Sequence, residues 1–180
     1  MGNRARVTTL LVSLLLVFGL GLGSAQAQEP PQPLDGSCCG CNGTIKFRSA
    51  TKPDLVRVGT RIFPTAAINP FDDGFTFLLS NANGTLISET LAPGVVTEKP
   101  NGRRWVYKNP AARVSGGIHT MTVQEMSGPA GGFIVYVRAY ADLTTATEAE
   151  MTTGIVIGAS SFFDHSDWNQ RKSGWRHVFW

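Results

Sequence analysis

The fold of this chain is decided by residues 74–91, GFTFLLSNANGTLISETL. Phe75, Phe77 and Leu79 recur at every second position, the period at which side chains of a β-strand return to the same face. Residues 81–84, Asn-Ala-Asn-Gly, then supply a turn, and a second strand-like run follows. The stretch therefore predicts two antiparallel strands joined by a tight turn.

The same two-residue period recurs on both sides of this hairpin. Further strands are predicted at residues 44–49, 55–63, 103–108, 117–126, 132–140, 151–158, 160–163 and 174–179. Only residues 143–150 look helical, as a turn or two with Asp142 as N-cap. The pattern predicts an all-β fold, a single antiparallel β-sandwich of about nine or ten short strands with one short helical turn.

The first 27 residues have the features of a secretory signal peptide. Arg4 and Arg6 precede an almost wholly apolar run at residues 10–22, and Ala25-Gln26-Ala27 supplies a small-x-small cleavage site. The apolar run is shorter than the about 20 residues that cross a bilayer core. We expect cleavage near Ala27 and a mature protein that is secreted or periplasmic.

Three segments follow from these patterns. Residues 1–27 form the signal peptide, residues 28–43 a disordered Pro-rich spacer with a cysteine cluster, and residues 44–180 the β-sandwich domain. Loss of residues 1–27 removes two of the 16 basic residues and none of the 13 acidic ones, so the mature chain has a net charge of +1. This near-neutral balance is evidence against a dedicated nucleic-acid-binding protein.

Several short motifs occur in a familiar order. They are Gly74-Phe75-Thr76-Phe77, Asn83-Gly84-Thr85, Leu91-Ala92-Pro93-Gly94, Asn101-Gly102-Arg103-Arg104-Trp105, Ala141-Asp142-Leu143 and Gly174-Trp175-Arg176. In this order the chain resembles, over roughly residues 45–178, a recurrent type of exported bacterial β-rich protein. The resemblance implies a β-rich fold and export, and it implies no activity because none is assigned to that type.

The three cysteines, Cys38, Cys39 and Cys41, lie within four residues. In an oxidising compartment Cys38–Cys41 is the more plausible local disulfide, since adjacent cysteines bridge only with strain. The odd thiol would then permit a disulfide-linked dimer. A redox-active thiol or a metal site stays open as an alternative, although zinc would need a fourth ligand from one of the histidines, His119, His165 or His177.

The polar segment at residues 164–167, Asp-His-Ser-Asp, contains the residue types of a hydrolase triad. Neighbours in an extended segment point to alternate faces, so they do not converge as nucleophile and base. We predict no catalytic residue, no cofactor and no metal site in the sandwich, and hence a protein that is not an enzyme.

Exposed aromatic rings are the candidate ligand surface. Trp105 and Tyr107 share a strand face, and Trp168 and Trp175 lie near the C-terminus. Such rings stack on sugars when they are exposed, and the alternative is that they fill the core. Outward strand positions also predict a mildly basic face for an anionic glycan or an envelope surface, made of Lys46, Arg48, Arg57, Arg61, Arg104 and Lys108.

The sequence thus predicts a non-enzymatic binding or structural module whose partner is an envelope or extracellular glycan or protein. Three alternatives remain. The first is a glycan-active hydrolase or carbohydrate-binding domain, which as a hydrolase needs two carboxylates across a cleft. The second is a thiol- or metal-binding protein acting through the cysteine cluster. The third is a small outer-membrane β-barrel, against which the short strands and their basic faces argue.

Overall fold

The computed structural model describes residues 36–127 and 131–178, and for residues 36–40 it gives the backbone alone. The elements in chain order are β1 (Gly36–Lys46), β2 (Asp54–Pro64), α1 (Pro70–Asp73), β3 (Phe75–Asn81), β4 (Gly84–Leu91), β5 (Thr97–Glu98), β6 (Arg104–Lys108), α2 (Ala112–Ser115), β7 (Gly117–Glu125), β8 (Phe133–Ala141), β9 (Glu150–Ile157), β10 (Ser160–Asp167), β11 (Asn169–Arg171) and β12 (Gly174–His177). None of the helices in this part of the chain is long and apolar enough to cross a membrane.

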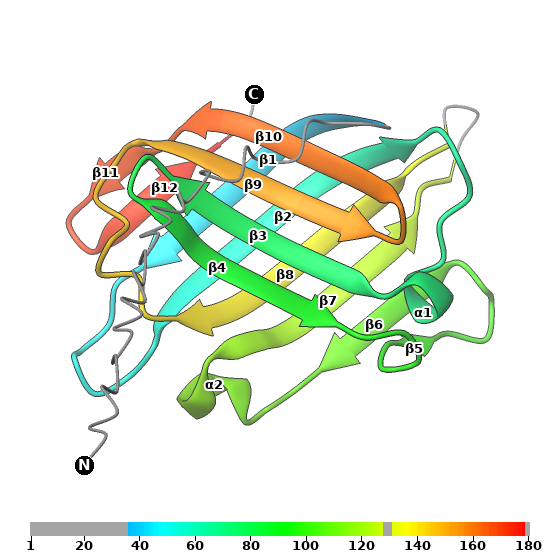
Figure 1. Cartoon of the computed structure of the whole chain (residues 1–180), viewed down its shortest axis with the longest axis horizontal. Coiled ribbons are helices and arrows are strands. Elements are labelled where there is room, and N and C mark those ends of the chain that lie inside the picture. Colours follow the sequence, from blue (N-terminus) through cyan, green and yellow to red (C-terminus); the bar gives the residue numbers. More distant parts are fainter. Residues whose placement is uncertain (1–35, 128–130, 179–180) are drawn as a thin grey trace, which may run out of the picture. The chain divides into compact units, whose positions relative to one another are not determined.

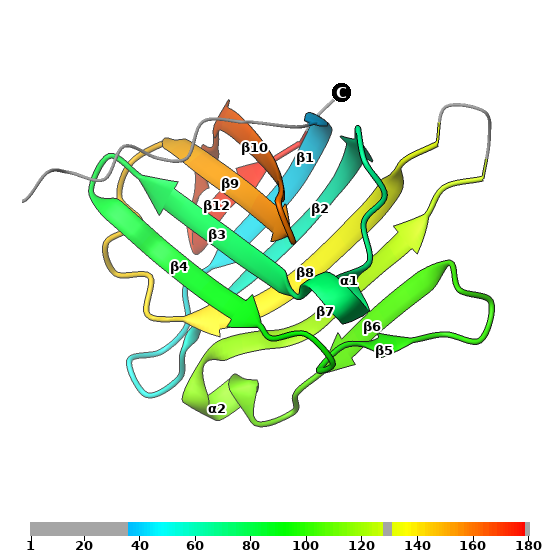
Figure 2. The same ribbon diagram turned by 45° about the vertical axis from the view of Figure 1, so that its right-hand side comes forward.

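These strands form two antiparallel sheets, which confirms the predicted β-sandwich. The larger has eight strands in the order β11-β12-β1-β2-β8-β7-β6-β5, and the smaller has four in the order β10-β9-β3-β4. Two views show the four-stranded sheet lying over one face of the eight-stranded sheet (Figures 1 and 2). The larger sheet therefore has an inner face on the core and an outer face toward solvent.

The hairpin predicted over residues 74–91 is confirmed, because β3 and β4 pair antiparallel along their length. At its turn the backbone N–H of Asn83 donates to the side-chain oxygen of Asn81 at 2.9 Å. Gly84 has a φ of 113°, a value that favours glycine because it carries no Cβ. Asn81 and Gly84 thus form the turn in the two ways the sequence predicts, by a side-chain hydrogen bond and by a positive φ.

The inward rows of both sheets meet in one hydrophobic core. Phe75, Phe77 and Leu79 of β3 are at most 1% exposed. The eight-stranded sheet contributes Ile45, Val56, Val58, Ile62, Val135, Val137 and Ala139, and the four-stranded sheet adds Met151, Ile155, Ile157 and Phe162. Each fully buried side chain of this size contributes about 1.5–3 kcal/mol, so the period-two pattern of the sequence is the main source of the stability of the domain.

The first strand begins earlier than its sequence pattern indicates. β1 starts at Gly36 instead of Thr44, so the cysteine cluster lies in a strand and not in the spacer predicted for residues 28–43. Its pairing with β2 shifts register between Cys39 and Asn42. Backbone pairing needs no apolar side chain, and it extends the strand through a segment without a two-residue period. The predicted signal peptide and the rest of the predicted spacer lie outside the described residues.

The helical turn predicted at residues 143–150 is wrong. The side chain of Asp142 accepts the N–H of Thr144 at 3.1 Å, which makes a local turn, and no helix follows. Leu143 and Ala146 are at most 1% exposed, because this segment carries the chain from β8 to β9 along the core. The short helices α1 and α2 lie elsewhere, each beside a strand.

Substitution of Gly43 tests how closely β1 packs on the core. A Cβ at Gly43 would overlap the six-membered ring of Trp168, which is 2% exposed and has little room to move. We expect Gly43→Ala to lower the free energy of unfolding by about 1–3 kcal/mol. Urea denaturation measures this, with Thr44→Ala on the exposed side of the same strand as the control. Equal stability of the two variants would contradict the packing.

Candidate functional site

The aromatic residues expected to form a ligand surface lie in the core. Trp105, Trp168 and Trp175 are 6%, 2% and 5% exposed, and Tyr107 is partly buried against the same core. The indole N–H of Trp175 donates to the carbonyl oxygen of Ala146 at 2.7 Å. Since a sugar stacks only on a ring face that solvent reaches, these indoles offer no stacking surface. Core packing, the alternative interpretation of the sequence, accounts for their positions.

Of the three cysteines, only Cys41 has a described side chain. Cys41 is buried on the inner side of β1, whereas the side chain of Cys38 lies outside the described part of the chain. The Cys38–Cys41 disulfide therefore stays a prediction. No three His, Cys, Asp or Glu side chains of residues 41–127 and 131–178 gather closely enough to hold a metal ion.

Neighbouring residues of β10 alternate between its two faces, as the sequence indicates. The ring of His165 shares a hydrogen bond of 2.7 Å with the hydroxyl of Thr152 in the paired strand β9. On the other face the hydroxyl of Ser166 donates to Asp164 at 3.0 Å. Ser166 and His165 thus point away from each other and do not form a nucleophile–base pair.

One row of residues across the eight-stranded sheet is strongly basic. Its consecutive cross-strand partners, from β12 to β6, are Arg176, Thr44, Arg57, Arg138, Thr120 and Lys108. Directly opposed residues of paired strands point to the same face. The next pair along β2 and β8, Val58 and Val137, is buried in the core, so the basic row lies on the outer face.

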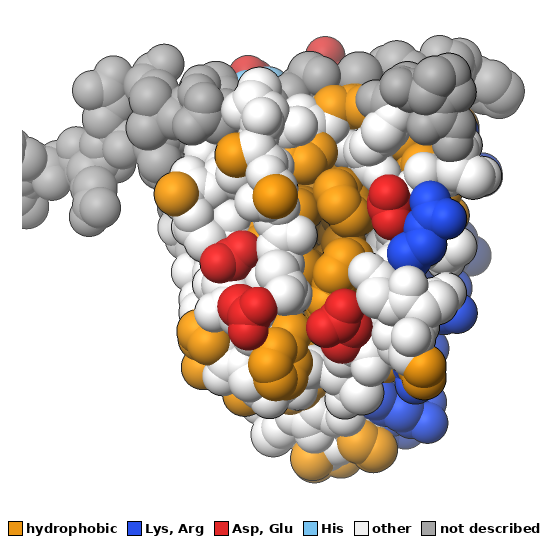
Figure 3. Space-filling view, turned by 90° about the vertical axis from the view of Figure 1, so that its right-hand side faces the viewer, with side chains coloured by type: hydrophobic (Ala, Val, Ile, Leu, Met, Phe, Trp, Pro, Cys, Tyr) orange, Lys and Arg blue, Asp and Glu red, His pale blue; other side chains and the backbone are white. Residues whose placement is uncertain are grey.

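The rest of this outer face is also free of acidic residues. Asp54, Glu98 and Glu125 pair with residues of the inner face, so no carboxylate of the described strands occupies an outward position of the eight-stranded sheet. In an end-on view, the visible Lys and Arg lie along one side of the molecule; an acidic side chain touches them near the top, and the other visible Asp and Glu lie apart from them (Figure 3). We define the basic face as Lys46, Arg57, Arg61, Arg104, Lys108, Arg138 and Arg176.

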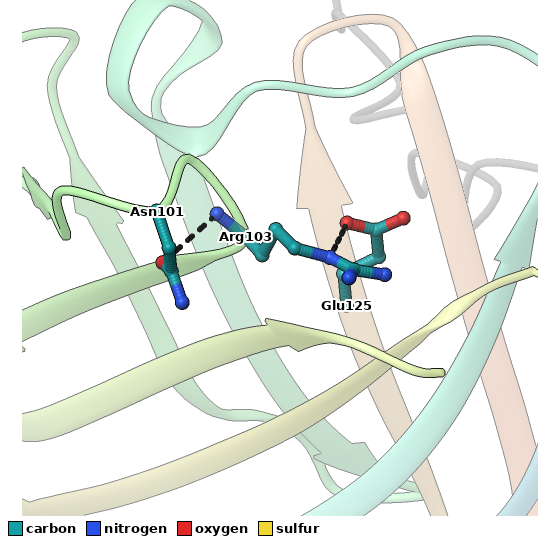
Figure 4. Close-up of polar contacts among 3 residues, drawn as sticks. All are labelled: Asn101, Arg103 and Glu125. Atoms are coloured by element: carbon teal, nitrogen blue, oxygen red, sulfur yellow. Dashed lines mark hydrogen bonds and ion pairs between the residues drawn. The ribbon is translucent and has the colours of Figure 1, made fainter.

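Arg103 is the one cation of the described residues that lies in an ion pair. Its Nε is 2.8 Å from Oε2 of Glu125, and its backbone N–H donates to the side-chain oxygen of Asn101 at 3.2 Å (Figure 4). The two charged side chains are 55% and 38% exposed, and such surface pairs contribute about 0–1 kcal/mol. Arg103 is not part of the basic face, and no ion pair of the described residues includes a member of that face.

Two adjoining hollows lie in the basic face. One, of about 460 Å³, is lined by Arg57, Arg138 and Arg176 together with His177 and uncharged residues. The other, of about 320 Å³, brings Lys46 and Arg48 together with the same Arg57 and Arg138. An anionic group bound in either hollow would meet several cations and no carboxylate, and the two central arginines would serve both positions.

Tyr140 orders two of these cations. The guanidinium carbons of Arg48 and Arg138 each lie 5.5 Å from the centre of its ring. Arg138 also donates from Nη2 to the hydroxyl of Tyr140 at 2.8 Å. The ring itself is 3% exposed, and cation–π contacts of this kind are worth about 0.5–2 kcal/mol each. These guanidinium groups are therefore oriented before a ligand arrives, which reduces the entropy lost on binding.

An exposed aromatic ring lies beside the arginines. Tyr136 is 57% exposed and is the cross-strand partner of Gly59. A Cβ added to Gly59 would come within 3.0 Å of the Tyr136 ring, so the ring lies close over the glycine of the neighbouring strand. Tyr136 also lines the same 460 Å³ hollow as Arg57, Arg138 and Arg176. The hollow thus combines a flat apolar surface with three positive charges.

A further pocket of the described structure has a mixed lining. It has a volume of about 770 Å³ and lies where the β1–β2 loop meets Ser115 and Gly116. Its buried Asp54 accepts the backbone N–H groups of Arg48 and Leu143 at 2.6 and 3.3 Å and so organises the loop. The other acidic residues of the lining lie among basic ones, so this pocket favours neither sign of charge.

The sequence identified only part of this site. It placed Lys46, Arg48, Arg57, Arg61, Arg104 and Lys108 on an outer face, and the register agrees for all of them except Arg48. Arg48 lies in the loop that follows β1, because the strand ends at Lys46. It did not single out Tyr136, Arg138 and Arg176. The signal for the first two is the inward row of residues 133–139, which leaves the even-numbered positions outward.

Comparisons of the chain with protein-family models, with curated proteins and with solved structures found no match.

Removal of one central arginine tests whether the basic face is electrostatically strained. Arg57 lies directly opposite Arg138, and like charges in this arrangement destabilise a sheet. We expect Arg57→Gln to raise the free energy of unfolding of the ligand-free protein by roughly 0.2–1 kcal/mol at low ionic strength. The gain should shrink in about 1 M salt, because screening weakens the repulsion.

Arg61→Gln is the matched control for this measurement, since Arg61 faces the uncharged Ile134 on the same two strands. It should change stability by less than about 0.5 kcal/mol. A loss of stability in Arg57→Gln, or the same gain in both variants, would show that the two central arginines do not repel each other measurably.

Proposed function

We propose that this chain is a non-enzymatic binding module of the cell envelope or the extracellular space, and that it binds a polyanionic ligand through the basic face. The single observation that carries the proposal is the alignment of Arg57, Arg138 and Arg176 in one cross-strand row, on β2, β8 and β12, with no carboxylate on the same face among the described residues. A cluster of one sign of charge attracts ligands of the opposite sign and raises their association rate.

The side-chain types on the face suit this role. Arginine presents a planar fork of N–H donors that matches a carboxylate, sulfate or phosphate group in two-point hydrogen bonds. In the same row Thr44 lies between Arg176 and Arg57, and Thr120 lies next to Arg138. The hydroxyl groups of both threonines can donate and accept hydrogen bonds. The face therefore offers charge for an anion and neutral hydrogen-bonding groups for the rest of the ligand.

Export is part of the proposal. The pattern of residues 1–27 supports a signal peptide that is cleaved near Ala27, which would deliver a secreted or periplasmic protein. In that oxidising compartment Cys38 and Cys41 would form the disulfide, and Cys39 would be left for a second chain. The ligands to expect are then the anionic polymers found outside the cytoplasm.

Binding to immobilised heparin, a generic polyanion, tests the proposed function. We expect retention at low salt and release at high salt, because the affinity comes from the release of counterions. Arg57→Gln/Arg138→Gln should lower the slope of log affinity against log salt by about two, one for each lost contact.

A variant with the same net charge provides the control. Lys52→Gln/Lys99→Gln also removes two positive charges, but from loops outside the basic face, and it should bind as the unaltered protein does. If neither the unaltered protein nor the control is retained, or if both double variants lose affinity equally, the basic face is not a binding site.

Intact mass spectrometry of the protein recovered from its own host tests export and the thiols. We expect the mass of residues 28–180 less the hydrogens lost on disulfide formation, as a monomer or a disulfide-linked dimer. A mass that includes residues 1–27, or fully reduced cysteines in protein from an extracytoplasmic fraction, would contradict this part of the proposal.

A further inference from the structure

We infer that the ligand of the basic face is an acidic polysaccharide that lies across the strands, with a sugar ring on Tyr136 and its acidic groups on Arg57, Arg138 and Arg176. This inference rests on the proposed function and names the class of ligand. Two parallel rows of residues on the outer face of the eight-stranded sheet support it.

The first row is the basic one described above. The second lies two residues along each strand and consists of Asn42, Gly59, Tyr136 and Thr122 as cross-strand partners. Residues two apart on a strand share a face and are separated by about 6.5–7 Å. A neutral row with one aromatic ring therefore runs beside the charged row, and all four of its members line the 460 Å³ hollow.

A polysaccharide fits this pair of rows. Its rings present C–H faces that pack on an aromatic ring, and its hydroxyl groups match the side chains of Thr44, Thr120 and Thr122. Neighbouring strands are about 4.8 Å apart. Arg57 and Arg138 are separated by one such spacing, and Arg57 and Arg176 by two. A polymer with acidic substituents along one edge would place its rings over the neutral row and its charges over the basic row.

Other polyanions fit the face less well. Tyr136 is the one exposed large apolar side chain of the described residues on this face, since Phe71, Val95 and Val114 lie on other elements. A membrane surface would leave the neutral hydrogen-bonding row unused and would favour several apolar residues for insertion. Single-stranded nucleic acid favours successive aromatic rings for successive bases. A sugar polymer needs one ring and many hydroxyl contacts.

The test is titration calorimetry of the mature chain with four probes. Polygalacturonate and dextran sulfate carry the acidic group as carboxylate and as sulfate, neutral dextran carries none, and an oligothymidylate of equal charge represents nucleic acid. We expect at least one acidic polysaccharide to bind more tightly than the oligothymidylate, and neutral dextran not to bind. Comparison of the first two probes identifies the acidic group.

Three variants locate the contact. Tyr136→Ala should weaken polysaccharide binding by roughly two- to tenfold and leave oligothymidylate binding unchanged, while Tyr136→Phe should retain the affinity. Arg57→Gln/Arg138→Gln should weaken it by more than about tenfold. The Tyr136 side chain is 57% exposed but its ring lies close over Gly59, so the thermal unfolding midpoint of each variant is measured first. If the alanine variant does not fold, Tyr136→Leu, which removes the ring and keeps an apolar side chain, should show the same loss of affinity.

The outcomes separate this inference from the proposed function. Binding of every polyanion with equal affinity, or an unchanged affinity in Tyr136→Ala while the arginine variant loses it, would overturn the polysaccharide and leave the basic face as a general anion site. Absence of binding to all three charged probes would overturn the proposed function as well.

Discussion

The burial of two facing apolar rows sets the register between β2 and β8, and the outer surface depends on this register. Val56 lies opposite Ala139 and Val58 opposite Val137, all of them on the core side. A slip by one residue would turn these side chains toward water and bring Arg57 into the core. The hydrophobic effect therefore imposes the position of each arginine, although the arginines take no part in the core.

An electrostatically unfavourable arrangement is thus held in place by the core. Arg57 and Arg138 have no carboxylate beside them on the outer face, and the stacking of Arg138 on Tyr140 orients its guanidinium group. Repulsion between like charges is small next to the burial of a row of apolar side chains. An anion that binds here relieves the repulsion and binds only the folded chain, so it would stabilise the domain by mass action.

Only those features of the candidate site that depend on local alternation could be predicted from the sequence. The period of two separates Arg57 and Arg61 from the apolar residues of β2, so their outward position is a local property. It does not reveal that Arg176, at the far end of the chain, joins them through β1, because strand order is set by contacts between distant segments. The surroundings of Tyr136 are hidden for a related reason, since its cross-strand neighbour is Gly59, a glycine on another strand.

The sequence left open whether the tryptophans form a ligand surface or fill the core. The amphipathic ring of tryptophan suits both a ligand surface and a core, and the choice between them depends on what the opposite sheet brings against it. Trp168 lies over Gly43, more than a hundred residues away in sequence, and the absence of a side chain there makes room for its ring. A local pattern contains no information about such a partner.

The sequence by itself determined the β-sandwich, most of its strands and the hairpin at residues 74–91, because alternation and turn residues act over a few neighbouring positions. Only the tertiary structure decided that β1 extends back to Gly36 and that residues 143–150 form a loop held to the core by Leu143 and Ala146, without a helix. It also decided that the indoles are buried and that three arginines from distant segments share one row. These features depend on pairing and packing between segments far apart in the chain, which no local period records.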